Sequence, residues 1–445
     1  MKSNHIFKEI FSTLYLQDLY REKIEFKASP GIDKINKDLF SKRFDKEIDI
    51  IIRKTYAQTY NFSYYLERLI SKGRDKCPRV LSIPTIRDKI TLKAIAEFLA
   101  KTHNEAVSRE LVHTKISNIK KDIFSCQYDT FIKIDIQSFF PNINHDKLLK
   151  IIKHKIHIKP FLDLLSKAIK QTTVVKSSSK VKKYSEEKGV PQGLSISNIL
   201  ADIFMQDIDK KYKSNTTIKY YRYVDDILIL CNQGQEKTLY EMIKKDFVKK
   251  DLSVHELNKD SNKTDFGLIS QGFNFLGYLY EDDKLTVRTS SIEKLENSII
   301  KIFAQYKYSK EKNIKWLEWV LNLKITGCRI DEKKYGWLFF FSQIDDIKLL
   351  FRLDKFVGSM CIKFGIDKEC KVKKFVRTYH EILNNRTDTK YIPNFDLFDF
   401  EDKRILLRDV FSLSINGWDE VKIEIAFKRK IYKSIKELEK DIQWY

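Results

Sequence analysis

Three acidic side chains have the types and neighbours that could hold metal ions for phosphoryl transfer. Asp135 lies in Phe131–Ile136, a β-rich run that alternates apolar and polar residues and predicts a strand. Asp225 and Asp226 separate two apolar runs that predict a β-hairpin with the acids at its tip. Acids from two adjacent strands can bridge two divalent ions about 3.5–4 Å apart, which activate a hydroxyl and neutralise a leaving group. Mg²⁺ prefers such carboxylate oxygens.

The order of three blocks carries more information than any one of them. An Asp-Asp pair is usually a solvated turn, and the chain has others at Asp282–Asp283 and Asp345–Asp346. The aromatics of Asp135–Phe140 could simply belong to the core. This block is followed by Gly189–Gly193, a Pro-Gln-Gly turn before a helical run, and then by Tyr223–Asp226. Their joint occurrence in this order is the specific signal.

The flanking patterns predict the elements that must position these blocks. Helical spacing of apolar residues predicts a helix over Ser195–Asp209, capped by Ser195 or Ser197. Phe273–Tyr280 predicts another short hairpin. A capping box at Ser290–Glu293 predicts the start of a further helix. A C-terminal amphipathic helix is expected from a stripe formed by Ile431, Ile435, Leu438 and Ile442.

The composition is that of a basic globular chain. Its 445 residues suit two to four packed subdomains, and 42% hydrophobic residues exclude a disordered chain. Lys and Arg number 83 against 61 Asp and Glu, a formal net charge of +22 that favours a polyanionic partner. Lys170–Gly189 is polar and loop-like, either a solvated hairpin or a contact with nucleic-acid backbone.

Other features predict a cytoplasmic enzyme with no membrane partner. No stretch reaches the roughly 18 apolar residues that a membrane-spanning helix needs. The N-terminus lacks the features of a signal peptide, and the six dispersed cysteines lack metal-ligand spacing.

Taken together, the blocks resemble reverse transcriptases. The family has the same order of an Asp-x-x-x-Phe-Phe block, a Pro-Gln-Gly turn, a Tyr-x-Asp-Asp hairpin and a Phe-Leu-Gly-Tyr element, here Phe275–Tyr278. Ser29–Asp33 resembles the N-terminal block of bacterial members, and Arg79–Asp88 resembles their fingers segment. The resemblance covers about residues 27–280.

This resemblance implies an α+β, right-hand polymerase fold with an antiparallel palm sheet and a helical C-terminal extension. We expect the fingers and N-terminal segment in residues 1–120 and the palm in 121–285, with interleaved fingers elements at 145–190. A helical thumb is expected in 286–349 and the extension in 350–445.

The family also implies roles for individual residues. Metal ligation falls to Asp135, Ile136, Asp225 and Asp226, with Asp135 and Asp225 as principal ligands. Nucleotide binding falls to Arg79, Phe140, Gln192 and Gly193, with Lys72 or Lys76 near Arg79. The primer grip falls to Phe275, Leu276, Gly277 and Tyr278.

Three of these roles have alternatives. Phe140 would exclude a ribose 2′-hydroxyl, unless it only packs in the core. Arg79 would contact the triphosphate, unless it is a surface ion-pair partner. The proton donor to pyrophosphate is Lys259 or Lys263, and we prefer Lys263 because Thr264 follows it.

The resemblance implies RNA-directed DNA synthesis with two Mg²⁺ ions, or Mn²⁺, acting on deoxynucleotides, an RNA template and a DNA primer. The chain lacks a His/Cys-rich nuclease pattern and room for an RNase H domain, and Ile325–Gly327 is similar to a retron thumb element. The chain then continues for more than a hundred residues, and a polymerase core with such an extension resembles stand-alone bacterial defence-associated enzymes. We therefore expect a role in antiphage defence with a specific non-coding RNA; an oligomer is also compatible.

The C-terminal third is expected to help hold that RNA. Its basic stretch offers Lys371, Lys373 and Lys374 to phosphates, and Phe375 or Tyr379 to unpaired bases. The alternative is an amphipathic helix that covers the thumb.

Alternatives for the whole chain are a retron or group II intron-like enzyme without a defence role, and a template-independent or protein-primed DNA polymerase. A catalytically silent RNA-binding scaffold is a third. A viral-type RNA polymerase is disfavoured because such enzymes usually carry Gly-Asp-Asp at the hairpin.

Overall fold

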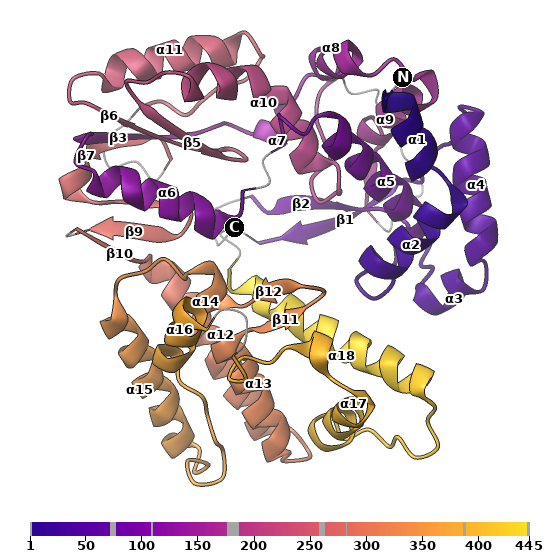
Figure 1. Cartoon of the computed structure of the whole chain (residues 1–445), viewed down its shortest axis with the longest axis vertical. Coiled ribbons are helices and arrows are strands. Elements are labelled where there is room, and N and C mark those ends of the chain that lie inside the picture. The colour runs from indigo at the N-terminus through magenta and orange to yellow at the C-terminus, as the bar shows by residue number, and fades with distance from the viewer. Residues whose placement is uncertain are drawn as a thin grey trace. The chain divides into compact units, whose positions relative to one another are not determined.

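The computed structural model describes residues 2–71, 77–107, 110–175, 187–257, 263–281, 283–385 and 389–442. It divides the chain into two compact units (Figure 1). The first comprises Met1–Arg109 and Gln127–Leu268, and the second comprises Glu110–Cys126 and Ile269–Trp444. Both units combine helices with largely antiparallel sheets, so the α+β class predicted from the sequence is confirmed.

The first unit mixes helices and strands along the chain. Its helices are α1 (Lys2–Ile10), α2 (Thr13–Lys23), α3 (Lys37–Ser41), α4 (Phe44–Tyr56), α5 (Ile86–Thr102), α7 (Phe139–Asn142), α8 (His145–Lys155), α9 (Lys159–Ile169), α10 (Ser197–Lys213) and α11 (Glu236–Val248). Its strands are β1 (Tyr65–Ile70), β2 (Arg79–Ile83), β3 (Thr130–Asp135), β4 (Thr173–Val174), β5 (Lys219–Tyr223), β6 (Asp226–Cys231) and β7 (Asp265–Leu268).

A four-stranded antiparallel sheet in the order β5-β6-β3-β7 carries the predicted acids. β3 and β6 are rich in β-branched and aliphatic residues, which suit strands buried on both faces. Helices α10 and α11 pack against this sheet, α10 next to β5 and α11 next to β3 (Figure 1). The apolar residues of α10 recur at helical spacing and are buried, namely Leu200, Ile203, Phe204 and Ile208.

A second sheet of the same unit has the order β2-β1-β4. β1 pairs antiparallel with β2 and parallel with β4. β4 lies in the expected loop Lys170–Gly189, whose residues 176–186 lie outside the described part of the chain.

The second unit is mainly helical. Its helices are α6 (Val112–Phe124), α12 (Thr289–Tyr308), α13 (Ile314–Thr326), α14 (Trp337–Phe340), α15 (Ile347–Lys363), α16 (Phe375–Asn384), α17 (Phe400–Ile405) and α18 (Glu420–Lys440), with short helical turns at Ile269–Gln271, Phe395–Leu397 and Leu406–Val410. Its strands are β8 (Phe273–Phe275), β9 (Tyr278–Glu281), β10 (Lys284–Val287), β11 (Cys328–Ile330) and β12 (Lys333–Tyr335). The predicted hairpin at 273–280 is β8–β9, and the predicted C-terminal helix is α18.

Two predicted helix caps are wrong. α10 begins after Ile196, and neither Ser195 nor Ser197 caps it. The Ser197 hydroxyl instead donates a 2.6 Å hydrogen bond to the Pro191 carbonyl, so it fastens the Pro-Gln-Gly turn to the helix. α12 begins after Arg288 without a side-chain cap, and the Ser290–Glu293 segment lies inside the helix.

The four-part division expected from the sequence stays a prediction. The two compact units group residues differently, because 110–126 belongs with the C-terminal unit. Among the described residues, no helix is long and apolar enough to cross a membrane.

Candidate active site

Strand register brings the three predicted acids to one end of the first unit's main sheet. Asp135, at the end of β3, is paired directly with Asp226, the first residue of β6. Side chains of directly paired residues lie on the same face, about 4.5–5.5 Å apart at Cβ. Asp225 lies in the two-residue turn before β6, and its carbonyl accepts a 3.4 Å hydrogen bond from the Ile136 amide. Adjacent residues within a strand point to opposite faces, but Asp225 lies in the turn and is not bound by this alternation.

The carboxylates of this group repel one another. Burial raises the pKa of Asp226 to about 7, and the charges of Asp225 and Asp135 add to the effect. Burial also raises the pKa of Asp225, with a further contribution from Asp135, while Arg79 and Lys263 act in the opposite direction. Such a concentration of anionic oxygens is stabilised by any cation that approaches it.

A lysine of the protein itself contacts Asp135. The Lys263 ammonium contacts the Asp135 carboxylate, and the His255 Nε2 lies 3.5 Å from the same oxygen. The Asp135 amide donates to the Thr264 hydroxyl at 3.2 Å, which holds the Lys263 segment beside β3. Lys259, the other candidate proton donor, lies outside the described residues.

The three acids have the donor chemistry for divalent ions but are not yet gathered around one point. Across the described residues, no three His, Cys, Asp or Glu side chains are grouped closely enough to hold a metal ion. Asp135 is engaged by Lys263 instead. The hard carboxylate oxygens fit Mg²⁺ by type, and metal ligation by Asp135, Ile136, Asp225 and Asp226 stays a prediction.

Backbone hydrogen bonds connect the Pro-Gln-Gly turn to two other predicted nucleotide-binding segments. The Ser82 amide on β2 donates to the Gln192 carbonyl at 2.8 Å. The Val190 amide donates to the Phe140 carbonyl at 2.9 Å. Gly193 has a φ of +93°, which favours glycine at this position, and a Cβ there would lie 3.5 Å from the Ser82 carbonyl oxygen and from Leu81.

The structure describes the surroundings of Arg79 and Phe140 but does not test their predicted roles. Arg79 begins β2, and its charge opposes the rise in the pKa of Asp225. Phe140 is partly buried, with its ring 5.5 Å from that of Phe139. It therefore packs against the core while part of its surface remains open. The roles of both residues stay predictions, and Lys72 and Lys76 lie outside the described residues.

The predicted primer grip belongs to the second unit. Leu276 and Gly277 both have positive φ, +48° and +79°, as a two-residue hairpin turn requires. Phe275, Leu276 and Tyr278 are buried, and the Tyr278 hydroxyl donates to the Phe340 carbonyl. The hairpin is thus part of the second unit's core, and its role at the acids stays a prediction.

The predicted RNA contact in the C-terminal third needs correction. Phe375 and Tyr379 lie on the buried face of α16, so the expected stacking of their rings on bases is wrong for this structure. Lys373 is half-buried, and its ammonium donates to the Tyr391 carbonyl at 2.6 Å. Lys371 and Lys374 are exposed. The segment matches the amphipathic alternative better, with phosphate contact by Lys371 and Lys374 left as the prediction.

Two residues near the acids were missed from the sequence. His255 approaches Asp135 from a distant segment after α11, and no spacing rule points to it. Arg222 lies two residues before the turn that carries Asp225, and this buried arginine donates to the Val224 carbonyl of that turn. An arginine within a strand next to a catalytic motif was the available signal.

Comparison with known proteins places this site in a family. Residues 70–280 match the family described as reverse transcriptase (RNA-dependent DNA polymerase). The chain is similar to protein YkfC of Escherichia coli strain K12, with 24% identity over 56% of this chain and 75% of that protein. It is also similar to the group II intron-encoded protein LtrA of Lactococcus lactis subsp. cremoris, with 30% identity over 45% of this chain and 33% of that protein.

Other matches cover different shares of the chains compared. A 91 kDa protein in the cob intron of Schizosaccharomyces pombe is 31% identical over 37% of this chain, which spans 20% of that protein. The solved telomerase of Candida albicans, in complex with a fragment of telomeric RNA, has a TM-score of 0.42 and 14% identity over 92% of this chain and 66% of that one. The chain thus spans three quarters of YkfC but a third or less of the intron proteins.

The matched segment contains every residue predicted to bind metal, nucleotide or primer. The order of the blocks, the pairing of Asp135 with Asp226 and the family match agree. Residues 70–280 therefore form a reverse transcriptase domain, an RNA-directed DNA polymerase domain related to those of group II intron-encoded proteins.

Proposed function

We propose that this polymerase extends a DNA primer along an RNA template by two-metal-ion chemistry at Asp135, Asp225 and Asp226. The observation that carries the proposal is the register of β3 and β6, which sets Asp135 opposite Asp226 with Asp225 in the adjoining turn. Two bound Mg²⁺ or Mn²⁺ ions would activate the primer 3′-hydroxyl and neutralise the leaving pyrophosphate.

The protein's own groups would then perform distinct tasks. Asp135 would exchange its contact with Lys263 for the metal site, which frees the ammonium to donate a proton to the departing pyrophosphate. Arg79 on β2 would pair with the triphosphate, and the Gln192–Gly193 turn, fixed to Ser82, would lie against the incoming nucleotide. The primer hairpin at 275–278 would support the 3′ end.

Single substitutions test this proposal. We expect Asp135→Asn and Asp225→Asn each to abolish deoxynucleotide incorporation on a primed RNA, because each removes a ligand charge. Asp226→Asn should leave a trace of activity. Incorporation should stop with a chelator and return with Mg²⁺ or Mn²⁺.

Asp283 supplies a matched control. Asp283, like Asp225, lies in a hairpin turn, here between β9 and β10. The φ of Asp283 is positive, and asparagine tolerates that conformation. Asp283→Asn should retain wild-type incorporation. Full activity of Asp135→Asn or Asp225→Asn would overturn the assignment of the acids, and incorporation of ribonucleotides alone would indicate an RNA polymerase.

We further propose a cytoplasmic role in antiphage defence, with a specific non-coding RNA as partner. The support is a large C-terminal region after the matched family segment, which ends at residue 280. In that region Lys371 and Lys374 are exposed beside α16. A group II intron-like role is compatible with the relatives, and the two are separated by identifying the RNA that co-purifies with the protein.

The RNA partner is tested with a double charge reversal at Lys371 and Lys374. Lys373 is left unchanged because it holds the Tyr391 carbonyl. We expect Lys371→Glu with Lys374→Glu to keep synthesis on a generic primed RNA but to abolish both the co-purification of RNA and the protection against phage. A variant that keeps both would contradict the RNA contact, and a wild-type protein that protects against no phage would contradict the defence role.

A further inference from the structure

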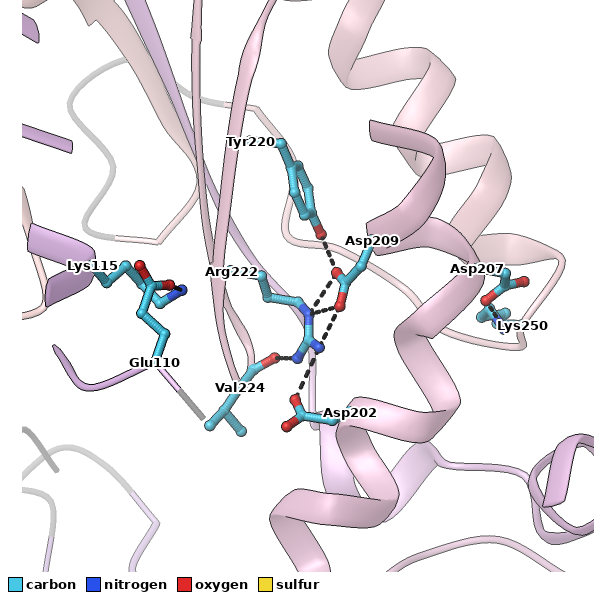
Figure 2. Close-up of polar contacts among 9 residues, drawn as sticks. All are labelled: Glu110, Lys115, Asp202, Asp207, Asp209, Tyr220, Arg222, Val224 and Lys250. Carbon is cyan, nitrogen blue, oxygen red and sulfur yellow. Dashed lines mark hydrogen bonds and ion pairs between the residues drawn. The ribbon is translucent and has the colours of Figure 1, made fainter. Parts of the chain in front are cut away.

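A buried arginine connects helix α10 to the turn that carries Asp225. The Arg222 side chain is 4% exposed. Its Nε donates to Asp209 at 2.8 Å, and its Nη2 donates to Asp209 at 2.6 Å and to Asp202 at 3.0 Å. Its Nη1 donates to the Val224 carbonyl at 2.8 Å. Figure 2 shows this guanidinium between the α10 acids on one side and the turn on the other.

The α10 side of this connection is rigid. Asp202 and Asp209 are seven residues apart, which places them on the same face of the helix two turns apart. The Tyr220 hydroxyl on β5 also donates to Asp209 at 3.0 Å. Arg222 stays charged, because hydrogen bonds and charge from Asp209 outweigh burial and raise its pKa. The cluster therefore provides a fixed frame next to the hairpin.

The turn side of the connection is strained. Val224 has a φ of +58°, a left-handed conformation that is unusual for a β-branched residue. Its carbonyl and the amide of Asp225 belong to one planar peptide group. A hydrogen bond to that carbonyl therefore restricts the orientation from which the Asp225 side chain leaves the backbone. The Asp225 carbonyl is held separately by the Ile136 amide.

We propose that Arg222 is a positioning residue, which uses the α10 acids as a frame to hold the Val224–Asp225 peptide in the conformation needed for catalysis. The inference rests on the proposed function of Asp225. Only a planar guanidinium reaches Asp209, Asp202 and the Val224 carbonyl together, so lysine cannot replace it at this site. Arg222 itself does not touch the substrate.

The test is single-nucleotide addition by the full-length protein on a primed RNA, measured by rapid quench. Two quantities are separated: the burst amplitude, which counts correctly folded enzyme, and the rate constant of the burst. We expect Arg222→Lys to lower the rate constant by about tenfold or more, since small misplacements of reacting groups cost up to about 100-fold. The burst amplitude of the variant should equal that of the wild type when both are measured at the same concentration of folded protein.

Lys250 supplies the matched control. Its ammonium pairs with Asp207 at 2.7 Å, and it is 11% exposed, so it also joins α10 to another segment of the same unit without touching the turn (Figure 2). Lys250→Met should leave the burst rate constant within about twofold of wild type, because a contact away from the turn does not set the geometry of Asp225.

A second-site substitution distinguishes positioning from general destabilisation. Asparagine adopts positive φ far more readily than valine. Val224→Asn should therefore restore part of the rate constant when combined with Arg222→Lys. Asp202→Asn, which leaves the Asp209 and Val224 contacts in place, should lower the rate constant less than Arg222→Lys does.

The outcomes are decisive in both directions. A wild-type rate constant in Arg222→Lys, or a loss confined to the amplitude, would overturn the inference while leaving the proposed function intact. Absence of any incorporation by the wild-type protein would instead remove the proposed function. If Arg222→Lys does not fold, Asp202→Asn decides the matter: a rate constant indistinguishable from that of Lys250→Met would overturn the inference.

Discussion

At the scale of single residues, the Asp135 carboxylate already has two neighbouring side chains, one of them the Lys263 ammonium. Lys263 and His255 both approach its carboxylate, from the segment that follows α11. A divalent ion at the same carboxylate would repel the Lys263 ammonium by like charge. In the proposed mechanism, metal binding at Asp135 would therefore release Lys263, which could then act as the proton donor to the leaving group.

Phe140 tests how the site would select its sugar. It is partly buried next to Phe139, and its carbonyl is tied to the Pro-Gln-Gly turn at Val190. If its ring lies under the C2′ of the nucleotide, Phe140→Val should lower discrimination against ribonucleotides by about tenfold or more, because differences of one or a few methylene groups are worth about 1–3 kcal/mol. The measurement is the ratio of incorporation efficiencies for dNTP and rNTP.

Phe139 controls for damage to the core in that experiment. It is buried beside Phe140, so Phe139→Leu should reduce stability without changing the ratio. An active Phe140→Val enzyme with an unchanged ratio would mean that Phe140 is only a core residue.

Sequence reasoning reaches those residues whose neighbours in the chain also indicate their chemistry. Asp135, Asp225 and Asp226 belong to short blocks with a fixed order, and strand pairing places Asp135 opposite Asp226. His255 could not be found this way, because its approach to Asp135 depends on the path of the chain after α11. The half-burial of Lys373 could not be predicted from the sequence either, because it depends on a contact with the Tyr391 carbonyl in a separate loop.

At the scale of elements, turns were easier to predict than helix starts. The β8–β9 turn needs two positive φ angles, and its Leu-Gly sequence supplies a glycine for one of them. The start of α12 was predicted at a capping box that the helix does not use. Capping is worth only about 1 kcal/mol, so packing of the apolar face can place the first turn elsewhere.

A cluster between α10 and α11 gives a pH-dependent contribution to stability. Burial would raise the pKa of Asp246, but hydrogen bonds from Lys211, Lys249 and Tyr212 outweigh it and lower the pKa to about 2. A depressed pKa stabilises the folded state above the unfolded-state value near 4, and the contribution disappears as pH falls toward 2. Because Lys211 and Lys249 are largely exposed, solvent screens their pairs with Asp246, and Asp246→Asn should cost about 1 kcal/mol at pH 6.

Urea unfolding at pH 6 and at pH 3 measures that contribution. The difference between wild type and Asp246→Asn should shrink at the lower pH. Glu241→Gln, at an exposed position on α11, should show little difference at either pH. An Asp246→Asn deficit that is equally large at both values would contradict the assigned role of the carboxylate.

At the scale of the whole molecule, the grouping of segments was harder to foresee than the class of fold. The expected boundary at residue 120 divides α6 between the N-terminal segment and the palm, whereas the whole helix lies in the unit formed mainly by residues 269–444. Within that unit the Lys120 ammonium contacts Asp345, more than 200 residues away. Local sequence patterns carry no information about a partner so distant in the sequence.

The net charge of +22 leads to a prediction about RNA binding as a whole. Each phosphate neutralised by Lys or Arg releases condensed counterions, so the logarithm of the binding constant falls linearly with the logarithm of salt concentration. With about six phosphate contacts or more, affinity for a primed RNA should fall by about 10³-fold between 50 and 200 mM salt. Fluorescence anisotropy across this range gives the slope, and a flat dependence would contradict binding led by phosphate contacts.

Neutralising Lys371 and Lys374 to Gln should reduce the slope of this salt dependence by about one for each phosphate that the protein no longer neutralises. The same change at Lys46 and Lys54, two exposed lysines of α4, should leave it unaltered if the C-terminal third holds the RNA.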